Sequence, residues 1–341
     1  MSWRYGDQSA THGLPIGVAE RAAVGQAVSA GDVIAAGTTY GSSVRVAAAR
    51  KLGIAPLDLE RVMRVRPGAE VERGAIVART GRRFARAVSA PIDGRLAHVR
   101  ADGDLELAPI VDRWSVRATL DGVVTASTEA SITVEGGAWA LQGVAGYGPD
   151  AIGELAVAVD GPGDELAPSR VDVRQRDRIL IGGGRSGPEA ITRAHACGVA
   201  AIVAGAVPAA GLRVVYGDDV SAHGDASRDD VPTVLCLLGF GNGPLPASIF
   251  APLVAMAGAR AAVHTASARL FVFAQPSTVQ VDPITPSLAL AADWGAVRPL
   301  DGAAALSGDV SFPSEITTPA VRTPDGPIPA ANVLLFSADR G

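Results

Sequence analysis

Lysine is almost missing from this sequence: Lys51 is the only lysine among 341 residues, and arginine supplies the other basic side chains. Aromatic residues make up only 4% of the chain, and its hydrophobic content comes mostly from alanine and valine. This composition predicts many short buried strands and small helices. The net charge of −5 leaves no basic surplus of the kind that a general nucleic-acid-binding protein carries, so we expect no nucleic-acid partner.

Long apolar runs and cysteine clusters are also missing. The chain is 48% hydrophobic but has no run of eighteen apolar residues, so we expect no membrane span. Residues 1–20 lack the features of a secretory signal. Cys197 and Cys236 are too few and too far apart for a disulfide framework, a structural zinc site or an iron–sulfur cluster. Together these absences predict a cytoplasmic protein with two buried thiols.

A short pattern occurs twice in the first half of the chain. Residues 28–35 resemble residues 71–78, since each segment has a valine, two further residues, a glycine and then β-branched residues. The glycine allows a tight turn with positive φ. Asp93-Gly94 and Asp121-Gly122 are typical of hairpin turns, so we predict a mostly β N-terminal half. Residues 44–53 are the exception and predict one short helix that ends at Gly53.

The second copy of this pattern belongs to a longer resemblance. Residues 65–98, with Pro67-Gly68, Gly74 and Ala90-Pro91 before Asp93-Gly94, resemble biotinyl/lipoyl carrier domains and related barrel-sandwich hybrids. Carriers of this family present one lysine on the hairpin between the two halves. Here that hairpin, residues 80–86, has three arginines and no lysine. Arginine stays protonated and is no nucleophile. The resemblance implies a scaffold or docking barrel, and we expect neither covalent biotin nor lipoate.

A glycine turn in the centre of the chain is the best candidate site for a small molecule. It joins a predicted strand (178–181) to a helix (188–197), and a second strand (199–204) follows in the order that favours parallel pairing. Backbone N–H groups at such a turn, together with the helix N-terminus, suit a phosphate or carboxylate. The candidate ligand-binding residues are Gly182, Gly183, Gly184, Ser186 and Gly187.

Two interpretations of this turn stay open. The glycine spacing fits a dinucleotide-binding loop, but no acidic residue ends the next strand and no Lys-Ser/Thr pair forms a P-loop. The glycines could equally serve only to make a tight turn. No catalytic arrangement can be placed from spacing, and catalytic groups assemble only in three dimensions. We therefore name no catalytic residue and no metal ligand, and whether the protein is an enzyme stays open, with a non-catalytic role favoured. One polar cluster is more typical of a surface loop than of a metal site: Asp218, Asp219, His223 and Asp225.

The chain is also similar to an uncharacterised bacterial KOW-domain family, through residues 179–183, 188–196, 198–203 and 239–241. This resemblance implies the architecture that the local patterns predict, an α+β multidomain chain. Its three parts are a β-rich, barrel-sandwich-hybrid-like N-terminal half (1–160), a small α/β (βαβ) central domain (170–275) and a short β-barrel-like, SH3- or KOW-like C-terminal segment (279–341).

We therefore predict a non-catalytic interaction or assembly protein that has a protein partner and uses the carrier-like barrel as a scaffold. The alternative is an accessory subunit that binds a phosphate-bearing ligand or nucleotide at residues 182–187. A redox subunit is a third alternative. It would need a bound flavin, because the chain lacks a cysteine cluster.

Overall fold

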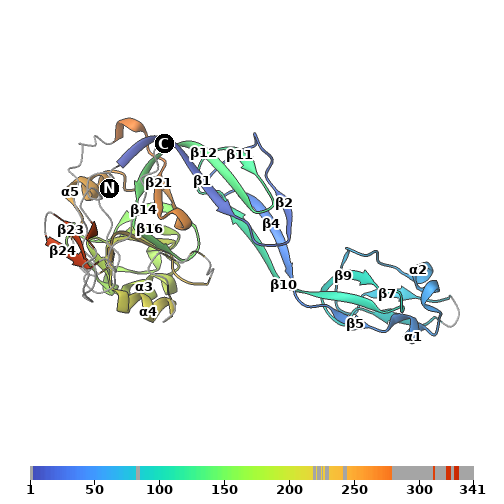
Figure 1. The fold of residues 1–341 in the computed structure, drawn as a ribbon. Helices are drawn as coiled ribbons and strands as arrows, with labels where there is room; N and C mark the ends of the chain where they lie inside the picture. The colour runs from blue at the N-terminus through green and yellow to red at the C-terminus, as the bar shows by residue number, and fades with distance from the viewer. Residues whose placement is uncertain are drawn as a thin grey trace.

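The computed structural model describes residues 3–81, 85–217, 230–240 and 244–278, three isolated residues (220, 224 and 226) and three short strands beyond residue 309. It is 45% strand and 19% helix, with mixed and antiparallel sheets, which confirms a β-rich α+β fold. Figure 1 shows an α/β body, a middle β layer and a small lobe that projects from the far end of strand β10. Among the described residues, no helix is both long enough and apolar enough to cross a membrane.

The α/β body is a partly parallel sheet with helices packed on it. Strands β14, β16, β18 and β19 pair in parallel in that order. Its strands are β13 (Ala145–Tyr147), β14 (Ala151–Val157), β15 (Glu165–Leu166), β16 (Arg178–Ile181), β17 (Arg185–Ser186), β18 (Ala201–Val207), β19 (Val234–Phe240), β20 (Arg260–His264) and β21 (Arg269–Val272). Its helices are η2 (Pro168–Arg170), η3 (Val173–Gln175), α3 (Pro188–Cys197), α4 (Ala209–Tyr216), α5 (Ala247–Ala255), η4 (Thr265–Ser267) and η5 (Pro276–Thr278).

The parallel unit forms where the sequence predicts it. Pro188 stands at the first turn of α3, and Gly198 ends the helix at φ 76°, a left-handed conformation that glycine adopts without strain. Strand β18 is buried at every position, as expected for a central parallel strand covered on both faces.

Part of the middle layer continues the same sheet. Strand β12 pairs with β21 of the α/β body, with β11 and along its length with β1, so one sheet runs through both parts. The strands of the layer that belong to this sheet are β1 (Trp3–Gly13), β3 (Ala27–Val28), β11 (Gly122–Ser127) and β12 (Ser131–Gln142). Its other strands belong to a second sheet that extends into the small lobe: β2 (Val18–Arg21), β4 (Val33–Tyr40) and β10 (Leu105–Arg117).

The small lobe, defined here as residues 44–109, has a core of its own. Val46, Leu59, Leu96, Leu105 and Leu107 are all buried in one cluster that is separate from the clusters of the other two parts. Besides the start of β10, the lobe contains β5 (Val44–Val46), α1 (Ala48–Leu52), η1 (Pro56–Asp58), α2 (Leu59–Val62), β6 (Glu70–Val71), β7 (Ile76–Arg79), β8 (Ala87–Ser89) and β9 (Gly94–Val99).

The predicted helix over residues 44–53 is wrong in its first half. Val44–Val46 forms β5 and pairs with β10, and the helix begins only at Ala48. Two β-branched residues that flank Arg45 favour a strand once a partner is present. The predicted end is correct, because Gly53 caps α1 at φ 69°.

Two copies of one β motif make up much of the small lobe and the middle layer. Each copy holds a Gly-x-x-Val-x-x-Gly segment (25–31 and 68–74) in which both glycines have positive φ. Each also holds an aspartate that binds the backbone next to the second glycine. Asp121 Oδ1 accepts from the N–H of Ala30 at 2.8 Å, and Asp93 Oδ1 accepts from Arg73 at 2.7 Å. The short repeat read from the sequence is therefore part of a longer structural repeat.

The two Asp-Gly pairs are not hairpin turns, contrary to the prediction. The strands on either side of Asp93, β8 and β9, pair with other strands and not with each other. The same holds for β10 and β11 around Asp121. Each pair instead connects strands that belong to different pairings. Its aspartate caps the glycine turn of the motif, and its glycine lets two backbones come close, since a Cβ at Gly94 would overlap the carbonyl oxygen of Ala108.

One copy of the motif is inserted into the other. In the inner copy, β7 and β8 pair and are joined directly through residues 80–86. In the outer copy, β4 and β10 take the corresponding places, and residues 41–109 occupy the position of that short connection. The Gly41 N–H donates to the Pro109 carbonyl at 2.9 Å, which closes the β4–β10 ribbon where the lobe begins. The small lobe therefore stands at the end of a two-stranded ribbon (Figure 1).

Little of the C-terminal segment lies among the described residues. Its three described strands, β22 (Val310–Ser311), β23 (Ala320–Thr323) and β24 (Gly326–Pro329), form an antiparallel sheet. The domain boundaries given above stay predictions.

Candidate functional site

The glycine turn predicted as a ligand site is a buried connection at the carboxyl end of β16. Gly182, Gly183, Gly184, Ser186 and Gly187 are all buried. The Gly182 N–H donates to the Val203 carbonyl at 2.8 Å, and the Gly184 N–H donates to the Asp164 carbonyl at 2.9 Å. Two donors of the turn are thus used by the fold itself. Ligand binding by these five residues stays a prediction.

The hairpin between β7 and β8 has no lysine, and hydrogen bonds join its two ends. The Thr80 N–H donates to the Arg86 carbonyl at 2.9 Å, and the Arg86 N–H donates to Thr80 Oγ1 at 3.2 Å. Residues 82–84 lie outside the described residues.

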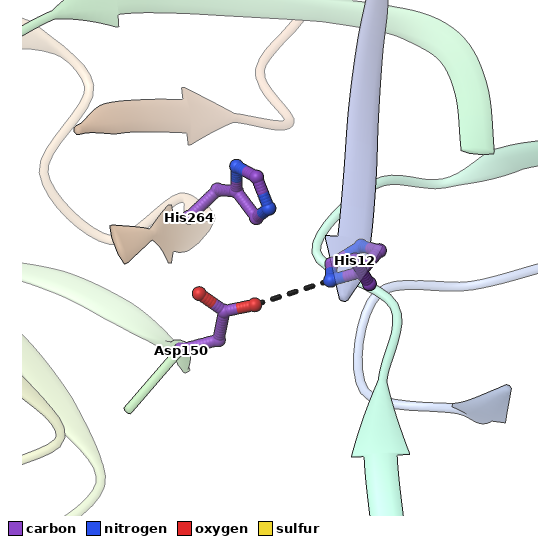
Figure 2. Close-up of side chains that lie close together, drawn as sticks. All are labelled: His12, Asp150 and His264. Atoms are coloured by element: carbon purple, nitrogen blue, oxygen red, sulfur yellow. Dashed lines mark hydrogen bonds and ion pairs between the residues drawn. The ribbon is translucent and has the colours of Figure 1, made fainter. Parts of the chain in front are cut away.

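A second group of polar side chains comes together where three distant segments meet. His12 stands near the end of β1, Asp150 directly before β14, and His264 at the end of β20. His12 Nδ1 lies 3.1 Å from Asp150 Oδ2, and the rings of His12 and His264 pack edge to face with centroids 4.8 Å apart. Figure 2 shows both imidazole rings close to the Asp150 carboxylate, with His264 above it and His12 to its right. We refer to these three residues as the His-Asp-His cluster.

The atoms on the outer side of the cluster are held by further hydrogen bonds. Asp150 Oδ1 accepts from the Thr265 N–H at 2.8 Å. His12 Nε2 lies 3.4 Å from both the N–H and the hydroxyl of Thr119, and His264 Nδ1 lies 2.6 Å from Ser267 Oγ. These hydrogen bonds fix the orientation of all three side chains.

Burial controls the charge of this cluster. It lowers the pKa of His264 to about 4, and the charges of His12 and Arg269 act in the same direction, against Asp150 and a backbone hydrogen bond to Thr11. Burial raises the pKa of Asp150, but the hydrogen bond to His12, the electrostatic effect of the two histidines and the Thr265 N–H outweigh it, so the pKa of Asp150 lies below its usual value. At pH 7 His264 is neutral and Asp150 is ionised.

A cleft of about 450 Å³ opens beside Asp150. It lies at the amino edge of the parallel strands, whereas ligands of doubly wound sheets bind at the carboxyl edge. Gly31 and Arg117 of the middle layer line one part, and Asp150, His195 and Thr233 of the α/β body line another. The guanidinium of Arg117 donates to the Gly31 carbonyl at 2.6 Å. The cleft thus combines a cation, a carboxylate and an imidazole.

Sequence reasoning missed the His-Asp-His cluster. His12 and Asp150 are 138 residues apart and belong to no local motif, so no spacing rule could pair them. The polar cluster that the sequence predicts to be a surface loop lies outside the described residues: Asp218, Asp219, His223 and Asp225. Both cysteines are buried, as predicted, and burial raises the pKa of the Cys236 thiol to about 12, so this thiol is unreactive at neutral pH.

Comparison with known proteins finds no significant match for this chain. No protein-family model matches the chain, and no curated protein or solved structure matches it significantly.

Proposed function

We propose that the protein is a non-catalytic interaction or assembly protein that presents its small lobe to a protein partner. The observation that carries this proposal is the placement of the lobe, which has its own core and stands at the end of the β4–β10 ribbon, away from the α/β body (Figure 1). A biotinyl/lipoyl-like, barrel-sandwich-hybrid identity of the lobe and an SH3- or KOW-like identity of residues 279–341 belong to the same proposal. A carrier-type hairpin without lysine is consistent with scaffolding.

The charge of the lobe indicates what kind of partner it fits. Residues 44–109 hold thirteen lysines and arginines but only eight aspartates and glutamates, a net charge of +5, although the whole chain has a net charge of −5. The basic charge is thus concentrated on the projecting part. Complementary charge speeds association and selects partners. The partner that this surface fits is an acidic protein.

The test replaces residues 41–109 with Asn-Gly, a two-residue turn that would join β4 to β10 directly. Because no described residue of the lobe belongs to the other two cores, we expect this variant to fold. Tagged full-length protein and variant are compared by quantitative capture from an extract of the source cells. We expect an acidic protein to be retained by the full chain, lost with the lobe and weakened by salt.

A second variant tests whether binding needs the positive charge of the lobe and not only the lobe itself. Arg50, Lys51 and Arg66 are exposed, and replacing all three with Gln leaves the lobe core intact. Weaker capture of the same partner supports the proposal. Equal capture by the lobe-deleted variant, or capture that nuclease treatment abolishes, contradicts it.

A phosphate-bearing ligand at residues 182–187 is the second candidate function. One observation favours it: Ser186 Oγ is buried and has no hydrogen-bond partner among the described residues. Native mass spectrometry tests it directly. A mass excess that disappears on denaturation and is absent from Ser186→Ala would support a bound ligand. Equal native and denatured masses, with no heat of binding for inorganic phosphate or a nucleotide, would exclude one.

A further inference from the structure

Three potential metal-binding atoms converge in the His-Asp-His cluster. One ring nitrogen from each histidine and one oxygen of Asp150 lie within 4.8 Å of one another. His12 and His264 are each 3% exposed. Ligands of a tetrahedral zinc ion lie about 3.4 Å apart, given metal–nitrogen distances near 2.1 Å. The pair of His12 Nδ1 and Asp150 Oδ2, at 3.1 Å, is close to this spacing, and an ion would draw the third ligand in by up to about 1.4 Å.

The hydrogen bonds behind His264 and Asp150 are those that a metal site needs. A histidine ligand uses one ring nitrogen for the metal and normally gives the other to an oxygen acceptor, which fixes the ring. The Ser267 hydroxyl can accept from His264 Nδ1, since a hydroxyl serves as donor or acceptor. His12 Nε2 faces both the hydroxyl and the N–H of Thr119, so with a metal on Nδ1 it would donate to the hydroxyl and give up the contact with the N–H. The Thr265 N–H holds the outer oxygen of Asp150, which leaves Oδ2 for the ion.

We infer that His12, Asp150 and His264 bind one divalent transition-metal ion of the zinc class, whose remaining coordination position faces the cleft beside Asp150. Two imidazoles and one carboxylate are a common donor set for such an ion, whereas magnesium and calcium prefer oxygen ligands. Asp150 is the only member of the cluster that lines the cleft within the described part of the chain, so a fourth ligand would enter from its side. The inference does not depend on the proposed docking function of the small lobe.

Such an ion would also join three segments that the sequence separates. The ends of β1 and β20 and the start of β14 belong to the one sheet that runs from the middle layer into the α/β body. Metal binding to the folded protein alone raises its stability by mass action. The site would thus link the two parts of the sheet next to the cleft.

The test is titration of the chelator-treated full-length protein with Zn²⁺ by calorimetry and with Co²⁺ by visible absorption. We expect one ion per chain and the d–d bands of a Co²⁺ site with nitrogen and oxygen ligands, without a thiolate charge-transfer band. Asp150→Asn and His264→Asn should weaken binding at least about 100-fold. His98→Asn is the matched control, because His98 is exposed on β9 and should not change the affinity.

A milder variant keeps the test decisive if removal of a ligand impairs folding. Ser267→Ala retains all three ligands and removes only the hydroxyl behind His264, so we expect about tenfold weaker binding. Unchanged Zn²⁺ affinity in both Asp150→Asn and Ser267→Ala, or no uptake of Zn²⁺ or Co²⁺ by the wild-type protein, would overturn the inference. Metal binding should persist in the lobe-deleted variant, which separates this result from the proposed docking function.

Discussion

Gly136→Ala is expected to destabilise the protein by about 3 kcal/mol, whereas Gly137→Ala, one residue further along β12, is expected to be neutral or slightly stabilising. A Cβ at Gly136 would overlap the backbone carbonyl oxygen of Asp121, and backbone cannot move aside as a flexible side chain can. A Cβ at Gly137 would meet only Tyr5 Oη, at 3.8 Å. The two glycines therefore have different roles.

Urea unfolding followed by circular dichroism measures both variants. The expected result is a much lower midpoint for Gly136→Ala with an unchanged slope, and a wild-type midpoint for Gly137→Ala. Similar midpoints for the two variants would show that the close approach of Asp121-Gly122 to β12 is not what requires glycine here. Gly122→Ala should resemble Gly136→Ala, because its Cβ would overlap the carbonyl oxygen of Glu135.

Acid is expected to destabilise the metal-free protein between pH 6.5 and about 4. Burial lowers the pKa of His264 from 6.5 to about 4 in the folded chain, so in this range the unfolded state binds a proton that the folded state does not. Stability is therefore complete above pH 6.5 and falls as the pH decreases. A shift of this size corresponds to a loss on the order of 3 kcal/mol. Asp150, whose pKa lies below its usual value, contributes in the same direction at lower pH.

The measurement is the free energy of unfolding of wild-type protein and His264→Gln at several pH values, with a chelator present. The variant is expected to be less stable at pH 7, because it loses the hydrogen bond to Ser267, but to show a smaller slope below pH 6.5. The slope is the informative quantity, since a purely structural loss would shift the whole curve. Parallel curves for the two proteins would contradict a neutral, buried His264.

Much of the fold could be predicted from local sequence. Pro188 and Gly198 mark the two ends of α3 because each has a backbone preference that acts without neighbours. The apolar segments on either side predict buried parallel strands, as β16 and β18 show. The absence of lysine from residues 80–86 rules out a carrier amine on that hairpin, whatever the fold around it.

Other features depend on partners that are distant in sequence. Val44–Val46 becomes a strand because β10 lies beside it. The Asp-Gly pairs do not form hairpin turns, because the strands on either side of each pair have other strands as partners. The insertion of one motif into the other likewise appears only when β4 is paired with β10. Local patterns contain no information about which strand will be the neighbour.

By itself, then, the sequence determined the β-rich composition, the glycine and proline positions that start and end elements, and the chemistry that residues 80–86 cannot perform, because these follow from properties of single residues and short segments. Only the tertiary structure decided where the small lobe stands and that His12, Asp150 and His264 meet. The first depends on strand pairing. The second depends on one sheet that brings three distant segments together. His12 and Asp150, for example, are 138 positions apart in the sequence.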